Sequence, residues 1–145
     1  MKGLLRVVVV LAAVFGVLQL VPLGSHGQNP PVRAEPPWPS AESRALAVRA
    51  CFDCHSNETR WPWYTNVAPV SWLAVHDVDE GRATLNFSEW DRPQKEADEA
   101  AEALVEGEMP MAIYLPLHPE ARLSDAEKKT LAEAFTQMFG AGDDD

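Results

Sequence analysis

The stretch Cys51-Phe52-Asp53-Cys54-His55 constrains this chain more than any other part of its sequence. Two cysteines separated by two residues and followed at once by histidine form the attachment signature of a c-type haem. A helical turn between the cysteines presents both sulfurs to one edge of the macrocycle, where each thiol can form a thioether bond. The adjacent imidazole then reaches the iron as one axial ligand. The motif therefore predicts one covalently bound haem c.

Two other kinds of site use a cysteine pair. A thioredoxin-like redox disulfide needs a βαβ pattern around the motif, and none is apparent. A zinc site needs about four ligands, and Cys51 and Cys54 are the only cysteines in the chain. Haem is the favoured interpretation, and a CxxC thiol-disulfide oxidoreductase stays an alternative.

The N-terminus has the pattern of a membrane anchor or a signal peptide, which we assign to residues 1–25. Lys2 and Arg6 precede an uncharged apolar run that extends to about Gly24, long enough to span the roughly 30 Å hydrocarbon core. The small residues around His26 form a weak cleavage site, so an uncleaved transmembrane helix is favoured. Positive charge keeps this end in the cytoplasm, which predicts a single-pass protein with its haem domain on the periplasmic side.

The remaining chain divides into three parts. Residues 26–39 hold five prolines and predict a stiff, extended linker. Residues 40–140 carry the haem motif and the helical patterns, and they form the expected c-type haem-binding domain. Residues 141–145 end in three aspartates and predict a solvated acidic tail.

Helix start and stop signals define an all-α domain of about four helices. The expected helices run from Ala41 into the haem motif, from Pro69 to Gly81, from Asp91 to Gly107, and from Ser124 to Gly140. Residues 85–90 and 108–122 are expected to be loops. No stretch alternates as a strand would.

The second axial ligand has four candidates: Met109, Met111, His76 and His118. Met109 is favoured because it lies in a loop between two helices, where a methionine has no core to fill, and Pro110 stiffens the backbone beside its sulfur. A thioether is a soft, neutral ligand that favours ferrous iron. Met111 is two residues away, so only one of the two methionines is expected to face the iron. The two histidines are expected to have structural roles.

Several further side chains are weaker candidates for haem contacts. Arg82 is a cation just past the expected helix end, where it could neutralise a haem propionate or simply be solvated. Trp61, Trp63 and Tyr64 could form a wall of the haem site or donate to a propionate, but loop packing explains them equally well.

Charge limits the possible partners. The chain carries 22 acidic and 12 basic residues, a formal net charge of −10. No nucleic-acid partner is expected, because nothing would neutralise the phosphates. An acidic surface suits redox partner proteins with a basic docking surface, although it also simply keeps a small domain soluble.

Linked motifs beyond the haem signature resemble the bacterial haem-binding domain family of small, often membrane-anchored c-type cytochrome-like proteins. The matching stretches are 51–57, 61–64, 67–72, 81–88, 107–110 and Tyr114 with His118-Pro119. The resemblance covers roughly residues 28–139. It implies a cytochrome c-like helical fold, a haem carried by Cys51 and Cys54, and His55 on the iron. Met111 stands where relatives often have a further proline or another residue. The resemblance therefore does not by itself decide between Met109 and Met111 as the axial ligand.

Together these features predict a mono-haem c-type cytochrome that transfers single electrons at the outer face of the cytoplasmic membrane, and no enzymatic activity. One alternative is a haem-based sensor or enzyme with a displaceable sixth ligand. The thiol-disulfide oxidoreductase is a second, and a structural haem module that serves a larger membrane complex is a third.

Overall fold

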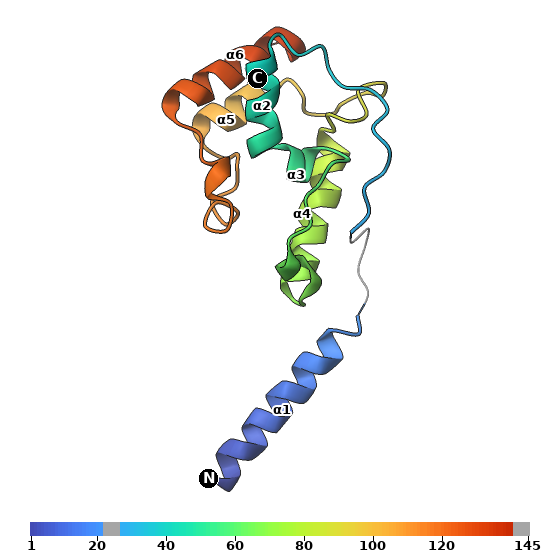
Figure 1. Cartoon of the computed structure of the whole chain (residues 1–145), viewed down its shortest axis with the longest axis vertical. Helices are drawn as coiled ribbons and strands as arrows, with labels where there is room; N and C mark the ends of the chain where they lie inside the picture. The colour runs from blue at the N-terminus through green and yellow to red at the C-terminus, as the bar shows by residue number, and fades with distance from the viewer. Residues whose placement is uncertain (22–26, 141–145) are drawn as a thin grey trace.

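The computed structural model describes residues 1–21 and 27–140 of the chain, and within them every regular element is a helix. Figure 1 shows the domain with one long N-terminal helix extending from it. The elements are α1 (Lys2–Leu18), α2 (Ala41–Ala50), α3 (Phe52–His55), the 3-10 turn η1 (Trp63–Asn66), α4 (Val70–Thr84), α5 (Ala100–Glu106), the 3-10 turn η2 (Pro119–Ala121) and α6 (Asp125–Phe139). The all-α prediction is confirmed for these residues. The acidic tail, residues 141–145, lies outside them.

The N-terminal helix is shorter than expected from the apolar run. α1 has 17 residues, and none of its side chains is buried. A span of the hydrocarbon core takes about 20 apolar residues. Among the described residues no helix is long and apolar enough to cross a membrane, so the expected transmembrane helix is not found there.

Side-chain caps begin two of the helices, α2 and α6. Ser40 accepts the backbone N–H of Ser43 at the start of α2, and Ser124 accepts that of Glu127 at the start of α6. Both helix starts were expected from the sequence, and each cap satisfies a backbone donor that the helix itself leaves free. An ion pair of 2.6 Å between Arg49 and Glu127 joins the two helices.

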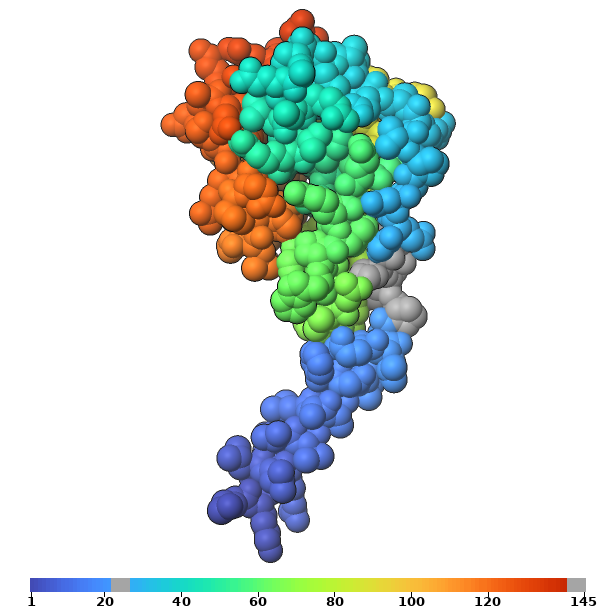
Figure 2. Space-filling view, in the orientation of Figure 1, coloured from blue at the N-terminus to red at the C-terminus, as the bar shows by residue number. Residues whose placement is uncertain are grey.

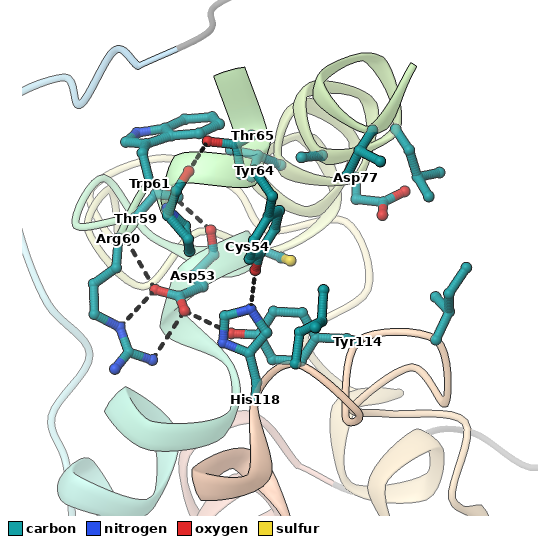
Figure 3. Close-up of a pocket in the computed structure, with 17 residues that line it drawn as sticks. Asp53, Cys54, Thr59, Arg60, Trp61, Tyr64, Thr65, Asp77, Tyr114 and His118 are labelled. Atoms are coloured by element: carbon teal, nitrogen blue, oxygen red, sulfur yellow. Dashed lines mark hydrogen bonds and ion pairs between the residues drawn. The ribbon is translucent and has the colours of Figure 1, made fainter. Parts of the chain in front are cut away.

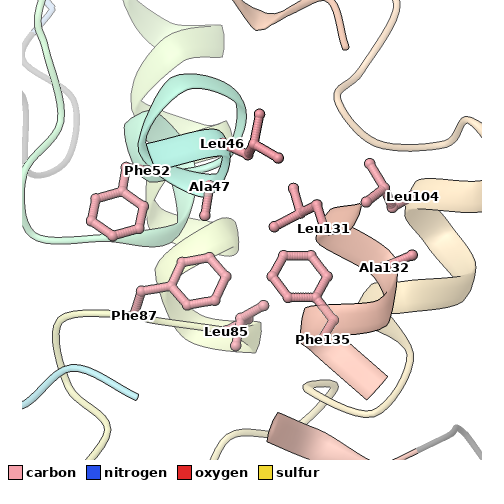
Figure 4. Close-up of a cluster of buried hydrophobic side chains, with 9 residues drawn as sticks. All are labelled: Leu46, Ala47, Phe52, Leu85, Phe87, Leu104, Leu131, Ala132 and Phe135. Carbon is pink, nitrogen blue, oxygen red and sulfur yellow. The ribbon is translucent and has the colours of Figure 1, made fainter. Parts of the chain in front are cut away.

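The hydrophobic core lies between α2, α3, α5, α6 and the loop after α4. Figure 4 shows its nine buried side chains: Leu46, Ala47, Phe52, Leu85, Phe87, Leu104, Leu131, Ala132 and Phe135. Phe87 is fully buried at the centre, with ring centroids 5.5 Å from Phe52 and 5.9 Å from Phe135. Because Phe52 lies inside the haem motif, the core fixes the position of that motif directly.

Two expected helix boundaries are wrong. α4 does not end at Gly81 but continues to Thr84, since the missing Cβ of that glycine serves a close helix contact rather than a helix stop. The third helix starts at Ala100 and not at Asp91. There the side chain of Gln94 binds the backbone N–H of Asn86 and the carbonyl of Glu89, and such local bonds compete with a helix.

The proline-rich segment forms no helix and packs along the domain. The backbone N–H groups of Arg33 and Ala34 donate to the carbonyl of Ser88, at 2.8 and 3.2 Å. The Trp38 ring lies 5.2 Å from that of Phe87, measured between centroids. Residues 27–39 therefore contribute contacts to the core and do not act only as a spacer.

Candidate functional site

The haem motif forms a single helical turn between α2 and α4. Cys51 ends α2 and precedes α3, and its carbonyl accepts the backbone N–H groups of Cys54 at 3.2 Å and His55 at 2.9 Å. Both cysteines are free thiols and half-buried. The turn predicted from the spacing is thus present, and it is held by the burial of Phe52 in the core.

The imidazole of His55 is oriented by two backbone carbonyls at the end of α4. Nδ1 lies 3.0 Å from the carbonyl oxygen of Gly81 and 3.1 Å from that of Leu85. Carbonyl oxygens only accept, so Nδ1 carries the hydrogen and Nε2 keeps its lone pair. Burial lowers the pKa of His55, which favours the neutral ring. A neutral imidazole fixed through Nδ1 is the arrangement in which histidine binds metals.

Gly81 brings α4 unusually close to the haem motif. A Cβ atom at this position would lie 2.6 Å from the carbonyl oxygen of Cys54 and 3.1 Å from its Cβ. Ordinary contacts between nonbonded heavy atoms lie near 3.5–4.0 Å. Glycine therefore allows the contact that also places its own carbonyl against His55.

Both thiols are protonated at neutral pH. Burial raises the pKa of Cys51 to about 12, and the nearby Cys54 adds to this. Burial also raises the pKa of Cys54 to about 12, with further contributions from the carboxylates of Asp77 and Asp53. Reactive cysteines in disulfide exchange have lowered pKa values, so this environment disfavours that chemistry in the free chain.

Met109 and His55 line the same cavity, which has a volume of about 180 Å³. Cys51 borders this cavity too, and the cavity walls include Phe87, Leu104 and Phe135 from the core. The Met109 side chain is 39% exposed. Gly107 ends α5 in the left-handed conformation with φ 81°, as expected, and lets the chain turn toward this site.

The other candidate axial ligands lie elsewhere. Met111 is not among the residues that line the Met109 cavity. His76 is exposed on α4, where its Nε2 lies 3.4 Å from the Glu80 carboxylate. His118 is buried, and its Nε2 is bonded to the Tyr64 hydroxyl. Among the four candidates, the structure brings only Met109 to the cavity of His55.

A second cavity of about 270 Å³ lies on the Cys54 side of the motif (Figure 3). Trp61 and Tyr64, both predicted as haem contacts, line it, whereas Trp63 is 78% exposed and does not. Figure 2 shows the surface here between the green 60–80 region and the orange loop that follows α5. The three aromatic residues thus do not form one wall.

A hydrogen-bonded cluster beside the motif was not predicted. Buried Asp53 accepts from the Tyr114 hydroxyl at 2.6 Å and from the Arg60 guanidinium at 2.9 and 3.1 Å. The ring of Tyr114 stacks on that of His118 with centroids 3.8 Å apart. The four-residue spacing of Tyr114 and His118 was a visible signal, but Asp53 lies 61 residues before Tyr114, and no local pattern links them.

A comparison with known protein families matches residues 13–137 to the haem-binding domain. The chain belongs to the haem-binding domain family. No curated protein and no solved structure matches the chain. Haem is therefore the cofactor that the family assigns to this fold.

The residues of this haem-binding domain suit such a cofactor. Two thiols lie on one helical turn, the adjacent imidazole offers Nε2, and a thioether borders the same cavity. Among the described residues no group of three or more His, Cys, Asp or Glu side chains is placed to hold a metal ion. The donor set of the motif thus fits a haem iron.

The Arg82 side chain has a structural role in the haem-binding domain. Its guanidinium is buried and donates to the carbonyls of Ser56 and Gln28 and to the side chains of Asn29 and Thr59, at 2.8–3.1 Å. Four of its five N–H donors are thereby used. The propionate contact stays a prediction, while these hydrogen bonds show that Arg82 ties segment 27–39 to the motif.

Proposed function

We propose that this haem-binding domain is a mono-haem c-type cytochrome that transfers single electrons. The observation that carries the proposal is the shared cavity of Cys51, His55 and Met109. A bound haem supplies the one-electron chemistry through its iron. Cys51 and Cys54 would hold it covalently, and His55 and Met109 would be its axial ligands.

The surrounding residues set the conditions for this chemistry. Two carbonyls fix the His55 ring, so it needs little reorganisation when the charge of the iron changes. The neutral thioether of Met109 would raise the reduction potential relative to a second imidazole. The core residues Leu104 and Phe135 keep water from one side of the cavity and lower the local dielectric.

The location and the partners follow from the same proposal. Haem is attached to c-type proteins outside the cytoplasm, so we place the domain at the outer face of the cytoplasmic membrane. The net charge of −10 favours redox partners with a basic docking surface. No enzymatic reaction is part of the proposal.

One observation favours a second candidate function. The Met109 side chain is 39% exposed, so a small ligand can reach its position from solvent. A haem-based sensor or enzyme would use this access to replace the sixth ligand. The thiol-disulfide oxidoreductase has no such support, because burial raises the pKa of both thiols to about 12.

A redox titration of the protein made with haem-attachment machinery tests the proposal. We expect one haem per chain and a reversible transition that follows a one-electron Nernst curve in visible absorbance. Carbon monoxide should not bind the ferrous wild type within minutes, but it should bind Met109→Ala promptly. Prompt binding to the wild type would favour the sensor or enzyme, and absence of haem would refute both.

A further inference from the structure

Trp63 is an aromatic residue near the haem motif that the haem site does not use. It lines neither the cavity of Met109 nor the cavity beside Cys54. Its side chain is 78% exposed, and its ring meets that of Tyr64 edge-on, with centroids 6.0 Å apart. A tryptophan combines a large apolar ring with a polar N–H, so it suits a boundary between an apolar phase and water.

Hydrogen bonds within η1 hold the turn that carries Trp63. The backbone N–H and the hydroxyl of Thr65 both donate to the carbonyl of Pro62, at 3.0 and 2.6 Å. The side-chain amide of Asn66 donates to the Trp63 carbonyl at 3.3 Å. The fold therefore presents the Trp63 ring at the surface in a defined position.

The sequence around this turn has no negative charge, although the chain is strongly acidic. Residues 59–76 contain no aspartate or glutamate, and Arg60 is their only lysine or arginine, whereas the whole chain has 22 acidic residues. Charged groups lose hydration at a lipid boundary, and anionic headgroups repel carboxylates. The charge pattern therefore allows the η1 end of the domain to approach a lipid surface.

The C-terminal end of α1 is bonded to the same end of the domain. Gln19, the residue after α1, accepts the backbone N–H of Ala68 at 2.9 Å and donates to the Ala68 carbonyl at 3.2 Å. Ala68 lies in the short connection between η1 and α4. Figure 1 shows the end of α1 next to the start of α4. Whatever covers α1 therefore ends close to the η1 turn.

The domain itself does not cover the apolar side chains of α1. From residue 7 to residue 18 the helix has no charged or polar side chain, and none of its residues is buried. A helix that is apolar on all sides is stable where an apolar phase surrounds it. A lipid bilayer is such a phase, and its boundary with water is where tryptophan concentrates in membrane proteins. The exposed helix and the exposed tryptophan thus call for the same partner.

We propose that the η1 turn, with Trp63 at its tip, binds the surface of the lipid bilayer that covers α1. The inference rests on the proposed function for the membrane location. The Trp63 ring would lie among the lipid headgroups, and the bonds between Gln19 and Ala68 would keep the turn at that depth. The haem domain would therefore keep one face toward the membrane, and its acidic surfaces would stay in water for a basic redox partner.

Thiol labelling of the full-length holoprotein in phosphatidylcholine nanodiscs tests this surface. Haem occupies Cys51 and Cys54 under the proposed function, so Asn66→Cys introduces the only free thiol. Asn66 is exposed on η1, and the matched control is Ala126→Cys, which is exposed on α6 at the end of the domain away from α1. The reagent is a maleimide disulfonate, which does not enter lipid, and intact mass measures the rate.

The thiol at position 66 is expected to react slowly in the nanodisc. The thiolate is the reactive form, and one unit of pKa elevation at the lipid boundary lowers its population tenfold. Asn66→Cys should therefore react at least about tenfold more slowly than Ala126→Cys. Equal rates at the two positions would overturn the proposal and would favour a partner protein as the cover of α1. A chain that does not enter the nanodiscs would also overturn it.

Variants of Trp63 separate its role from that of α1. In the Asn66→Cys background, Trp63→Ser should raise the labelling rate about tenfold, to that of the control, because serine has no apolar ring to hold the turn at the lipid. Trp63→Tyr should keep the slow rate, since tyrosine also suits the interface. If Trp63→Ser leaves the rate unchanged, the assignment is wrong. Haem absorbance of the same samples reports attachment separately, and a haem-free chain is read from the peptide that carries residue 66, so the two failures give different results.

Discussion

Gly81→Ala is expected to destabilise the domain, although alanine is normally the better helix former. The new methyl group would lie 2.6 Å from the carbonyl oxygen of Cys54 and 3.0 Å from its carbonyl carbon. These are backbone atoms of α3, so α3 and α4 must separate by about 0.5–1 Å to restore ordinary contact. Overpacking of this kind costs about 1–3 kcal/mol.

Two effects of the substitution oppose each other. Replacing glycine by alanine inside a helix contributes about 1 kcal/mol of stability. Because the clash is against backbone atoms and outweighs this gain, we expect a net loss of up to about 2 kcal/mol in the free energy of unfolding and a Tm lower by up to about 8 °C. Separation of the helices also moves the Gly81 carbonyl from His55, so the visible spectrum of the bound haem should change.

Thermal unfolding of the holoprotein, followed by circular dichroism, measures this effect. Gly16→Ala in α1 is the matched control, because a Cβ atom there meets nothing within 4 Å. It should leave Tm unchanged or raise it slightly. If Gly81→Ala is as stable as the wild type and keeps its spectrum, α3 and α4 do not approach as described.

Three further predictions concern the ligand, the thiols and the α6 cap. Met109→Ala should abolish the sulfur-to-iron charge-transfer band of the ferric protein and lower its reduction potential, while Met111→Ala should leave both nearly unchanged; the reverse result would exchange the two methionines. Without haem, Cys51 and Cys54 should react with iodoacetamide at pH 7 at least about a hundredfold more slowly than free cysteine, because both pKa values are raised to about 12, and rates like those of free cysteine would contradict this burial. Hydrogen bonds at the α6 cap and Arg49 lower the pKa of Glu127 to about 2, so the stability it adds should be complete above its unfolded pKa of about 4.3 and lost as the pH falls toward 2. The Tm difference between the wild type and Glu127→Gln should therefore shrink between about pH 5 and pH 2, and a constant difference would contradict this assignment.

The elements that the sequence predicted correctly depend on local chemistry. The caps at Ser40 and Ser124 and the αL residue at Gly107 act within one helical turn, so neighbouring residues determine them. The haem motif is local in the same sense. These features established the fold class and the positions of the two thiols and the imidazole.

The predictions that were wrong or incomplete concern residues whose structure depends on contacts with residues far away in the sequence. Gly81 resembles a helix stop in sequence, but its packing against Cys54, 27 positions earlier, keeps it inside α4. Arg82 resembles a free cation at a helix end, yet residues 28 and 29 accept its hydrogen bonds. Neither contact partner lies within the few turns of helix that a sequence pattern covers. Tertiary contacts therefore override the helix-end signal of these two residues.

The unpredicted cluster has the same origin. Tyr114 reaches Asp53 across 61 residues, and the stacking partner of Tyr114, His118, reaches Tyr64 across 54. Sequence spacing predicted that Met109 lies in a loop between helices. Only the fold shows that this loop reaches the cavity of His55.

The mass of the denatured protein tests covalent haem attachment, the central claim, most directly. The chain is made with haem-attachment machinery, extracted with acidic acetone and measured intact. We expect the wild type to keep the mass of one haem on the polypeptide and the double variant Cys51→Ala, Cys54→Ala to keep none. A wild-type chain that releases all its haem on extraction would contradict covalent attachment by these two thiols.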